Sequence, residues 1–124
     1  MKRNNELVLK ILTTLSRHDD PVQLSLCQFV GFPDLDQEGL DDHVALLEEK
    51  GFIAIESLQS GHSLYVMTWE GDDFIGYSQD VVLWRAATQV AGHLSFDHFY
   101  AILKDLILWK ARNIAEEISQ KKSR

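Results

Sequence analysis

Cysteine is nearly absent from this sequence, because Cys27 is the only one among 124 residues. A single cysteine excludes an internal disulfide and fits a reducing compartment, so we expect a cytoplasmic protein in which Cys27 is a small buried hydrophobe. No apolar run approaches the roughly 18 residues of a membrane-spanning helix. Met1-Lys2-Arg3 leads into a short amphipathic stretch that contains Lys10, which differs from a signal peptide, and we expect no membrane association.

The usual motifs of catalytic and cofactor sites are absent as well. The sequence has no glycine-rich phosphate loop, no Cys-x-x-Cys pair and no His-Glu-x-x-His stretch. A metal site on Asp42, His43 and a distant histidine is conceivable, but His43 adjoins an apolar helix stripe, which favours a packing role. His93 and His98 flank a predicted helix start and are candidates to pair across an interface. We therefore expect a non-enzymatic protein without a metal or a cofactor.

Basic residues are almost missing from the middle of the chain. Residues 19–80 contain fourteen acidic residues and one base, Lys50, for a net charge of −13, whereas residues 1–18 and 81–124 each carry +3. Proteins bind duplex DNA largely through Lys and Arg contacts to phosphate. A segment this acidic repels phosphate and suits a basic partner. The plainer interpretation, a solvated helix face, explains solubility but adds no affinity for DNA.

The stretch from Asp36 to Ile75 has the pattern of a helix, a hairpin and a second helix. Apolar residues at helical spacing extend to Leu47, and Lys50-Gly51 is a typical helix end. Residues 52–55 and 64–67 are predicted to pair as antiparallel strands around a Ser60-Gly61 turn. Thr68 can cap the helix that follows. This order predicts a winged helix, in which a recognition-type helix is followed by its wing.

Helical periodicity on both sides of this stretch completes the predicted fold. An Asn-capped helix is expected around residues 7–15, a short irregular helix near 26–30, and a further helix over 81–90. The fold class is mainly α with a small β-hairpin (α+β), with a winged helix-turn-helix domain over residues 1–78 and a C-terminal helical extension over 79–124. Trp69 is expected to join the wing-to-helix contact. One core is expected to contain Leu7, Ile11, Val44, Leu47, Phe52, Val66 and Phe74.

The last predicted helix, from Phe96 to about Ser119, is apolar on two sides, and Ser95 is its expected cap. One stripe suffices to dock a helix on a domain, so the second stripe indicates a partner, and we expect a two-fold homodimer. The rival is a monomer in which this helix is sandwiched between the first helix and the helix over 81–90. The residues expected at the dimer interface are Leu103, Ile107, Trp109, Ile114 and Ile118.

The sequence resembles a family of small uncharacterised bacterial and phage proteins, grouped as a domain of unknown function. The shared stretches are Met1-Lys2-Arg3, Leu7-Val8-Leu9-Lys10-Ile11-Leu12, His43-Val44-Ala45-Leu46-Leu47 and Met67-Thr68-Trp69-Glu70-Gly71-Asp72-Asp73-Phe74-Ile75, with Asp80, Trp84 and Ser95-Phe96-Asp97 in register. The family's box is Leu-Thr-Trp-Glu-Gly-His-Asp-Phe-Leu, so Asp72 replaces its usual His. The resemblance covers nearly the whole chain. It implies a winged-helix fold, related to phage or mobile elements, without a known enzymatic activity.

Two functions are compatible with these patterns. We favour an interaction module that docks a basic protein surface, and the acidic residues expected to contact that partner are Glu38, Asp41, Asp42, Glu48 and Glu49. The alternative is a DNA-binding transcriptional regulator of the winged-helix type, which would contact phosphate through Lys2, Arg3, Lys50, Ser60 and His62. Charge favours the first function, and fold analogy favours the second.

Overall fold

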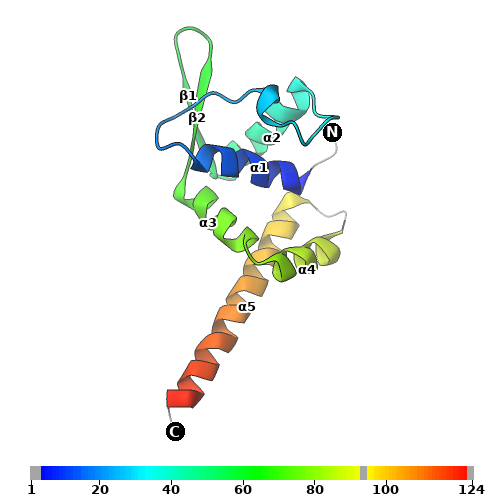
Figure 1. The fold of residues 1–124 in the computed structure, drawn as a ribbon, viewed down its shortest axis with the longest axis vertical. Coiled ribbons are helices and arrows are strands. Elements are labelled where there is room, and N and C mark those ends of the chain that lie inside the picture. The colour runs from blue at the N-terminus through cyan, green and yellow to red at the C-terminus, as the bar shows by residue number, and fades with distance from the viewer. Residues whose placement is uncertain (1–3, 93–94, 123–124) are drawn as a thin grey trace. The chain divides into compact units, whose positions relative to one another are not determined.

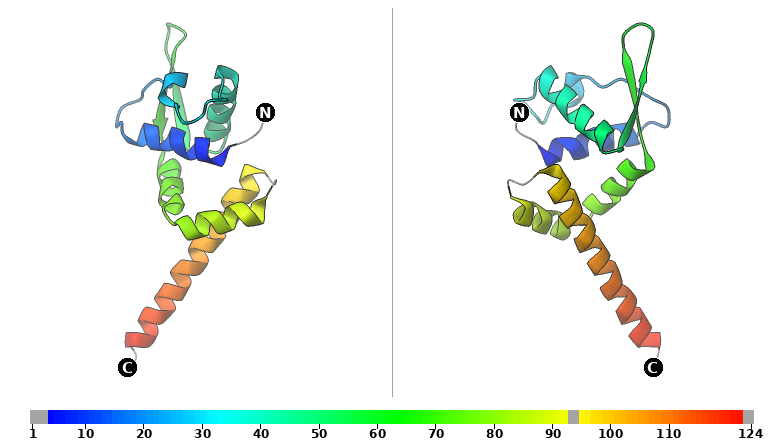
Figure 2. Two further views of the ribbon diagram at one scale, coloured as in Figure 1. Left: turned by 45° about the vertical axis from the view of Figure 1, so that its right-hand side comes forward. Right: turned by 180° about the vertical axis from the view of Figure 1, so that it is seen from behind.

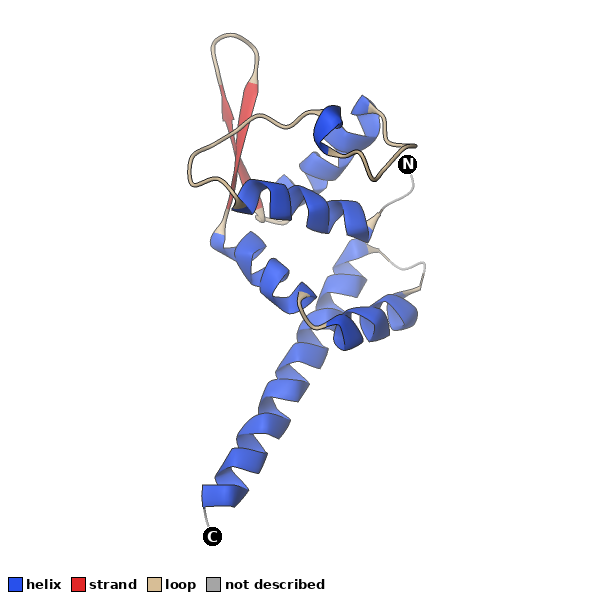
Figure 3. Ribbon diagram, in the orientation of Figure 1, coloured by secondary structure: helices blue, strands red, loops and turns tan. Residues whose placement is uncertain are grey.

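The computed structural model describes residues 4–92 and 95–122, which fold mainly as helices with one antiparallel two-stranded hairpin (Figures 1 and 3). The predicted class, mainly α with a small hairpin, is confirmed. The chain forms two compact units, residues 1–76 and 77–124, which are described separately below. The division falls inside helix α3 (Trp69–Ser78), whereas the sequence suggested a division after residue 78.

Helix α1 (Asn5–Ser16) begins the first unit and buries the apolar stripe that its sequence predicts. The side-chain oxygen of Asn4 accepts hydrogen bonds from the backbone N–H groups of Glu6 and Leu7, at 3.0 and 3.2 Å. This cap satisfies two N–H groups that have no partner within the helix. A single 3₁₀ turn, η1 (Leu26–Gln28), stands where the sequence predicts a short irregular helix. The buried side chains of α1 are Leu7, Val8, Ile11, Leu12 and Leu15.

Helix α2 (Gln37–Glu49) packs one apolar face into the same unit and turns its acidic face outward. The Asp36 carboxylate caps it by accepting a hydrogen bond from the Gly39 N–H at 2.7 Å. At the other end the chain turns at Gly51, whose φ of 77° lies in the left-handed region that suits glycine. The buried residues of α2 are Gly39, Leu40, His43, Val44 and Leu47.

Strands β1 (Ile53–Ser57) and β2 (Ser63–Met67) form the hairpin that the sequence predicts. They pair antiparallel from Ile53 opposite Met67 to Ser57 opposite Ser63, so the expected pairing of these segments is confirmed. Val22 adds an isolated bridge to Tyr65, with N–H···O distances of 2.9 and 2.7 Å in the two directions. The tip of the hairpin projects away from the helices of its unit (Figure 1).

Helix α3 is attached to the base of the hairpin by close packing. The Thr68 hydroxyl accepts a hydrogen bond from the Gly71 N–H at 3.3 Å and donates one to the Gly51 carbonyl, so the expected cap is confirmed. Gly71 is buried, and a Cβ there would overlap the backbone oxygen of Phe52. The rings of Phe52 and Phe74 stack below this contact, with centroids 5.3 Å apart.

The second unit consists chiefly of α4 (Val81–Ala91) and the long helix α5 (Phe96–Lys122). The rings of Trp84 and Phe99 meet edge to face at 5.0 Å between centroids, and they join the two helices. Helix α4 packs on the N-terminal half of α5 only, and the C-terminal half extends beyond it (Figures 1 and 2). Helix α4 has 11 residues and α5 has 27, so α4 is too short to cover the whole length of α5.

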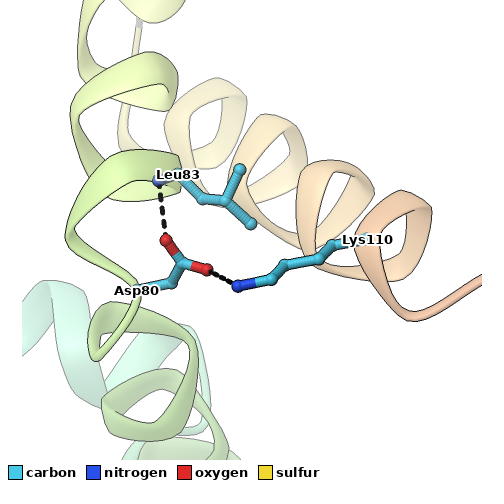
Figure 4. Close-up of polar contacts among 3 residues, drawn as sticks. All are labelled: Asp80, Leu83 and Lys110. Atoms are coloured by element: carbon cyan, nitrogen blue, oxygen red, sulfur yellow. Dashed lines mark hydrogen bonds and ion pairs between the residues drawn. The ribbon is translucent and has the colours of Figure 1, made fainter. Parts of the chain in front are cut away.

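Asp80 caps α4 and also links it to α5 (Figure 4). One carboxylate oxygen accepts a hydrogen bond from the Leu83 N–H at 3.0 Å, and the other accepts one from the Lys110 ammonium. The hydrogen bond from Lys110, followed by that from the Leu83 N–H, lowers the pKa of Asp80 below its ordinary value of 3.8. The pair therefore marks the point along α5 at which contact with the start of α4 ends.

Three expectations about the core are wrong or need adjustment. Trp69 is 92% exposed, because it precedes the core residue Phe74 by five positions, which places the two on faces about 140° apart on a helix. Cys27 is exposed, because η1 buries none of its side chains. Val66 is only half-buried, since all of β2 is only partly covered. The other six expected core residues are buried.

Candidate partner-binding surface

A cleft of about 650 Å³ lies in the first unit beside the start of α2. Four carboxylates line it: Asp34 and Asp36 come from the segment before α2, and Glu38 and Asp42 come from the first turns of the helix. Glu38 and Asp42 are four residues apart, which places them on the same face of α2. The cleft thus gathers negative charge from two neighbouring segments.

The rest of the cleft lining is largely apolar. Leu7 comes from α1, while Phe32, Pro33 and Leu35 come from the turn that precedes α2. Gly31 and Gly39 complete the wall together with Asn4 and His43. A lining that combines apolar side chains with carboxylates is suited to a long cationic side chain, because its methylene stem packs on the apolar wall while its charged end meets the acids.

His43 holds the wall of the cleft in place. Its Nε2 accepts a hydrogen bond from the backbone N–H of Asn4 at 3.1 Å, and its Nδ1 lies 2.7 Å from the Gly39 carbonyl oxygen. Because a backbone N–H can only donate, Nε2 carries no proton, and Nδ1 must donate to Gly39. The ring is 2% exposed and ties the start of α1 to α2. The packing role that the sequence predicts for His43 is therefore confirmed.

The structure separates the five acidic residues that were expected to contact a partner. Glu38 and Asp42 line the cleft, whereas Asp41 is exposed on α2 outside the lining and hydrogen-bonds Gln37 at 2.8 Å. Glu48 and Glu49 are exposed at the opposite end of the helix, about 15 Å from Glu38 along its axis. The sequence reasoning missed Asp34 and Asp36 as lining residues. Asp34 directly follows the Gly-Phe-Pro turn and Asp36 caps α2, and these positions were the available signal.

Two negative observations apply to the residues that the structure describes. No group of three or more His, Cys, Asp or Glu side chains in the described parts of the chain is arranged to hold a metal ion. None of the helices found there is long and apolar enough to cross a membrane.

A family model described as "Hypothetical protein (DUF2513)" matches residues 2–96. The match covers well over half of the chain. The chain belongs to the DUF2513 family. No curated protein sequence matches it. The resemblance to a family of unknown function is therefore confirmed, although the match ends at Phe96, so α5 beyond its first residue lies outside it.

The DUF2513 match includes the Thr68–Gly71 box, whose residues have three different roles in the structure. Thr68 caps α3, and Gly71 allows close packing on Phe52. Trp69 does neither and projects its ring into solvent. Asp72 and Asp73 follow it at helical spacings of three and four, and both are exposed, so Trp69 and two carboxylates share one face of α3. A large exposed aromatic beside acidic groups is a second candidate contact for a basic partner.

The described residues expected to contact phosphate in this DUF2513 chain are Lys50, Ser60 and His62, and Lys50 is the one formal cation among them. Ser60 and His62 lie at the exposed hairpin tip, where the Ser60 hydroxyl is 3.1 Å from Nδ1 of His62. Lys50 caps the C-terminus of α2 and is partly buried. Residues 53–67 contain no Lys or Arg and one acid, Glu56. Lys2 and Arg3 lie outside the described residues, as does His93 of the suggested histidine pair.

The five residues expected at a dimer interface occupy two different environments. Leu103 is fully buried within the chain, and Ile107 is partly buried. Trp109, Ile114 and Ile118 are 60, 47 and 50% exposed. Ile114 and Ile118 follow Lys110, the residue of α5 that contacts the start of α4, and share one face, whereas Trp109 lies about 140–180° around the helix from them. Exposed apolar side chains on consecutive turns of one face indicate a surface that another element covers.

Proposed function

We propose that the first unit is a winged-helix interaction module that binds a basic segment of a protein partner and catalyses no reaction. The winged-helix assignment is supported by the order α1, η1, α2, β1, β2 and by the isolated Val22–Tyr65 bridge, which ties the segment after α1 to the hairpin. In this assignment α2 is the recognition-type helix and the hairpin is the wing.

The observation that carries this function is the acid-lined cleft at the start of α2. Asp34, Asp36, Glu38 and Asp42 line it together with apolar residues, a combination that suits an arginine or lysine side chain. The exposed face of α3 with Trp69 and Asp73 provides another place where a cation could stack on an aromatic ring. The segment that contains both features has a net charge of −13, so the field over this unit attracts cations and repels phosphate.

A titration with a basic peptide tests the proposal. The probe is a fluorescein-labelled peptide of alternating arginine and alanine, and binding is followed by fluorescence anisotropy at about 150 mM salt, where charges beyond about 8 Å are screened. The test variant, Glu38→Gln with Asp42→Asn, removes two carboxylates from the cleft. The matched control, Glu48→Gln with Glu49→Gln, removes the same charge from the far end of α2.

We expect the cleft variant to bind about 2- to 30-fold more weakly, since each ion pair contributes about 0.2–1 kcal/mol, and the control to lose much less. Equal losses in both variants would mean attraction by bulk charge and would overturn the assignment of the cleft. The same titration is repeated with a labelled DNA duplex of about 20 base pairs. Duplex binding tighter than peptide binding at this salt would favour the DNA-binding regulator instead.

A further inference from the structure

An apolar seam begins at the partly buried Ile107 and continues into the C-terminal half of α5, where no described element of its own unit covers it. Ile107, Ala111, Ile114 and Ile118 follow one another at spacings of four, three and four residues. This is the heptad spacing at which two helices pack along their length. Helix α4 reaches only as far as the Asp80–Lys110 contact, so most of this seam lies beyond it. Ile114 and Ile118 are about half exposed as a result.

The two flanks of the seam differ in chemistry. Lys110 and Glu117, seven residues apart, lie along one flank, and Leu108 and Ala115, also seven apart, lie along the other. A second helix on this seam must therefore offer opposite charges on one side and apolar residues on the other. A second copy of α5 offers that combination when it lies antiparallel to the first.

We propose that α5 pairs antiparallel with α5 of a second copy of this chain. In the register that sets Ala111 against Ile114 of the second copy, Ile107 meets Ile118 in the same way. The positions of Lys110 and of Glu117 in the second copy then differ by only about 3 Å along the helix axis. Two-fold symmetry forms this Lys110–Glu117 pair twice, once from each copy. On the other flank, the same register places Leu108 of each copy beside Ala115 of the other.

Two features favour this orientation over a parallel pair. A parallel pair would place Lys110 opposite Ala115, so its ammonium would gain no acidic partner there. Antiparallel helices also align their dipoles favourably. The existing contact of Lys110 with Asp80 is compatible with the pairing, because an ammonium group has three N–H donors and this side chain is 52% exposed. The pairing does not depend on what the cleft of the first unit binds.

Sedimentation equilibrium of the full chain over a range of micromolar concentrations tests the pairing. We expect a monomer–dimer equilibrium in the wild type and monomer alone for Ile114→Asp, with an unchanged helical circular dichroism signal. Glu117→Lys should weaken the dimer roughly 3- to 10-fold by placing like charges together. The matched control is Glu116→Lys, which makes the same charge change on the opposite face of α5 and should leave the equilibrium unaltered.

Cysteine cross-linking in a Cys27→Ser background fixes the orientation. In the antiparallel register, the two copies of residue 111 are about 4 Å apart along the axis and the two copies of residue 118 about 16 Å apart. Residue 111 is level with residue 114 of the second copy, so oxidation of a mixture of Ala111→Cys and Ile114→Cys chains should cross-link the two variants to each other, whereas Ile118→Cys chains should not cross-link, because a disulfide needs Cα atoms within about 7 Å. Cross-linking of Ile118→Cys chains, without cross-linking of the mixed variants, would show a parallel pair and refute the proposal. A wild type that stays monomeric at the highest concentration would refute it as well.

Discussion

Gly71→Ala is the sharpest test of how the hairpin and α3 are packed. An alanine Cβ at this position would overlap the backbone oxygen of Phe52 and lie 2.7 Å from Cγ of Met67. Met67 can adjust its rotamer, but the Phe52 oxygen belongs to the main chain and accepts the Thr68 N–H at 2.9 Å. Backbone must therefore move, and the cap of α3 moves with it.

The expected loss of stability follows from three contributions. Overpacking of a tight site costs about 3 kcal/mol at the upper end of its usual range. Weakening of the hydrogen bond from Thr68 adds about 1 kcal/mol. Replacing glycine by alanine inside a helix returns about 1 kcal/mol. We therefore expect Gly71→Ala to lower the free energy of unfolding by about 3 kcal/mol.

Gly76 provides the matched control in the same helix. A Cβ at Gly76 meets no atom within 4 Å, so Gly76→Ala should show only the gain in helix propensity, up to about 1 kcal/mol. Urea unfolding followed by circular dichroism compares the two variants directly. If Gly71→Ala were as stable as Gly76→Ala, α3 could not be packed on Phe52 as described.

Further predictions concern Trp69 and Asp80. Trp69→Ala should change the unfolding free energy by less than about 0.5 kcal/mol, as surface substitutions usually do, whereas a core tryptophan would cost about 3–5 kcal/mol in the same urea assay. Asp80→Asn should destabilise the chain near neutral pH. Because the folded pKa of Asp80 is lowered below 3.8, its stabilising contribution is present above that value and is lost as the pH falls through the folded pKa. The difference between Asp80→Asn and wild type, measured by urea unfolding across pH, should therefore shrink in acid, and a difference that grew in acid would contradict the cause assigned to the shift.

Periodicity and capping residues predicted the elements of the first unit well. The apolar stripe of α1, the Asn cap, the hairpin and the Thr68 cap all depend on neighbours within a few residues, which the sequence displays directly. The exposed side of Trp69 was missed for a different reason. A tryptophan between a strand and a helix can be buried or exposed. The burial of Gly71 and Phe74 sets which face of α3 points into the core, and Trp69 lies on the other face.

The candidate site was predictable only in part. Acidity of α2 was evident from its sequence, and Glu38 and Asp42 at helical spacing were expected together. The cleft also depends on Phe32 and Pro33 lying beside the same cavity as Leu7 of α1, a tertiary arrangement without a local signature. That is why Asp34 and Asp36 were missed, and why Glu48 and Glu49 were grouped with residues about 15 Å away along the helix.

Amide chemical-shift mapping tests the central claim, that the acidic cleft receives a basic protein segment. The arginine–alanine peptide is titrated into the isotope-labelled chain at about 150 mM salt, and the backbone amide shifts are followed residue by residue. We predict saturable shifts concentrated around Phe32, Leu35, Glu38 and Asp42, with little change at the hairpin tip. Shifts confined to Ser60 and His62 on addition of duplex DNA, with none from the peptide, would contradict the account.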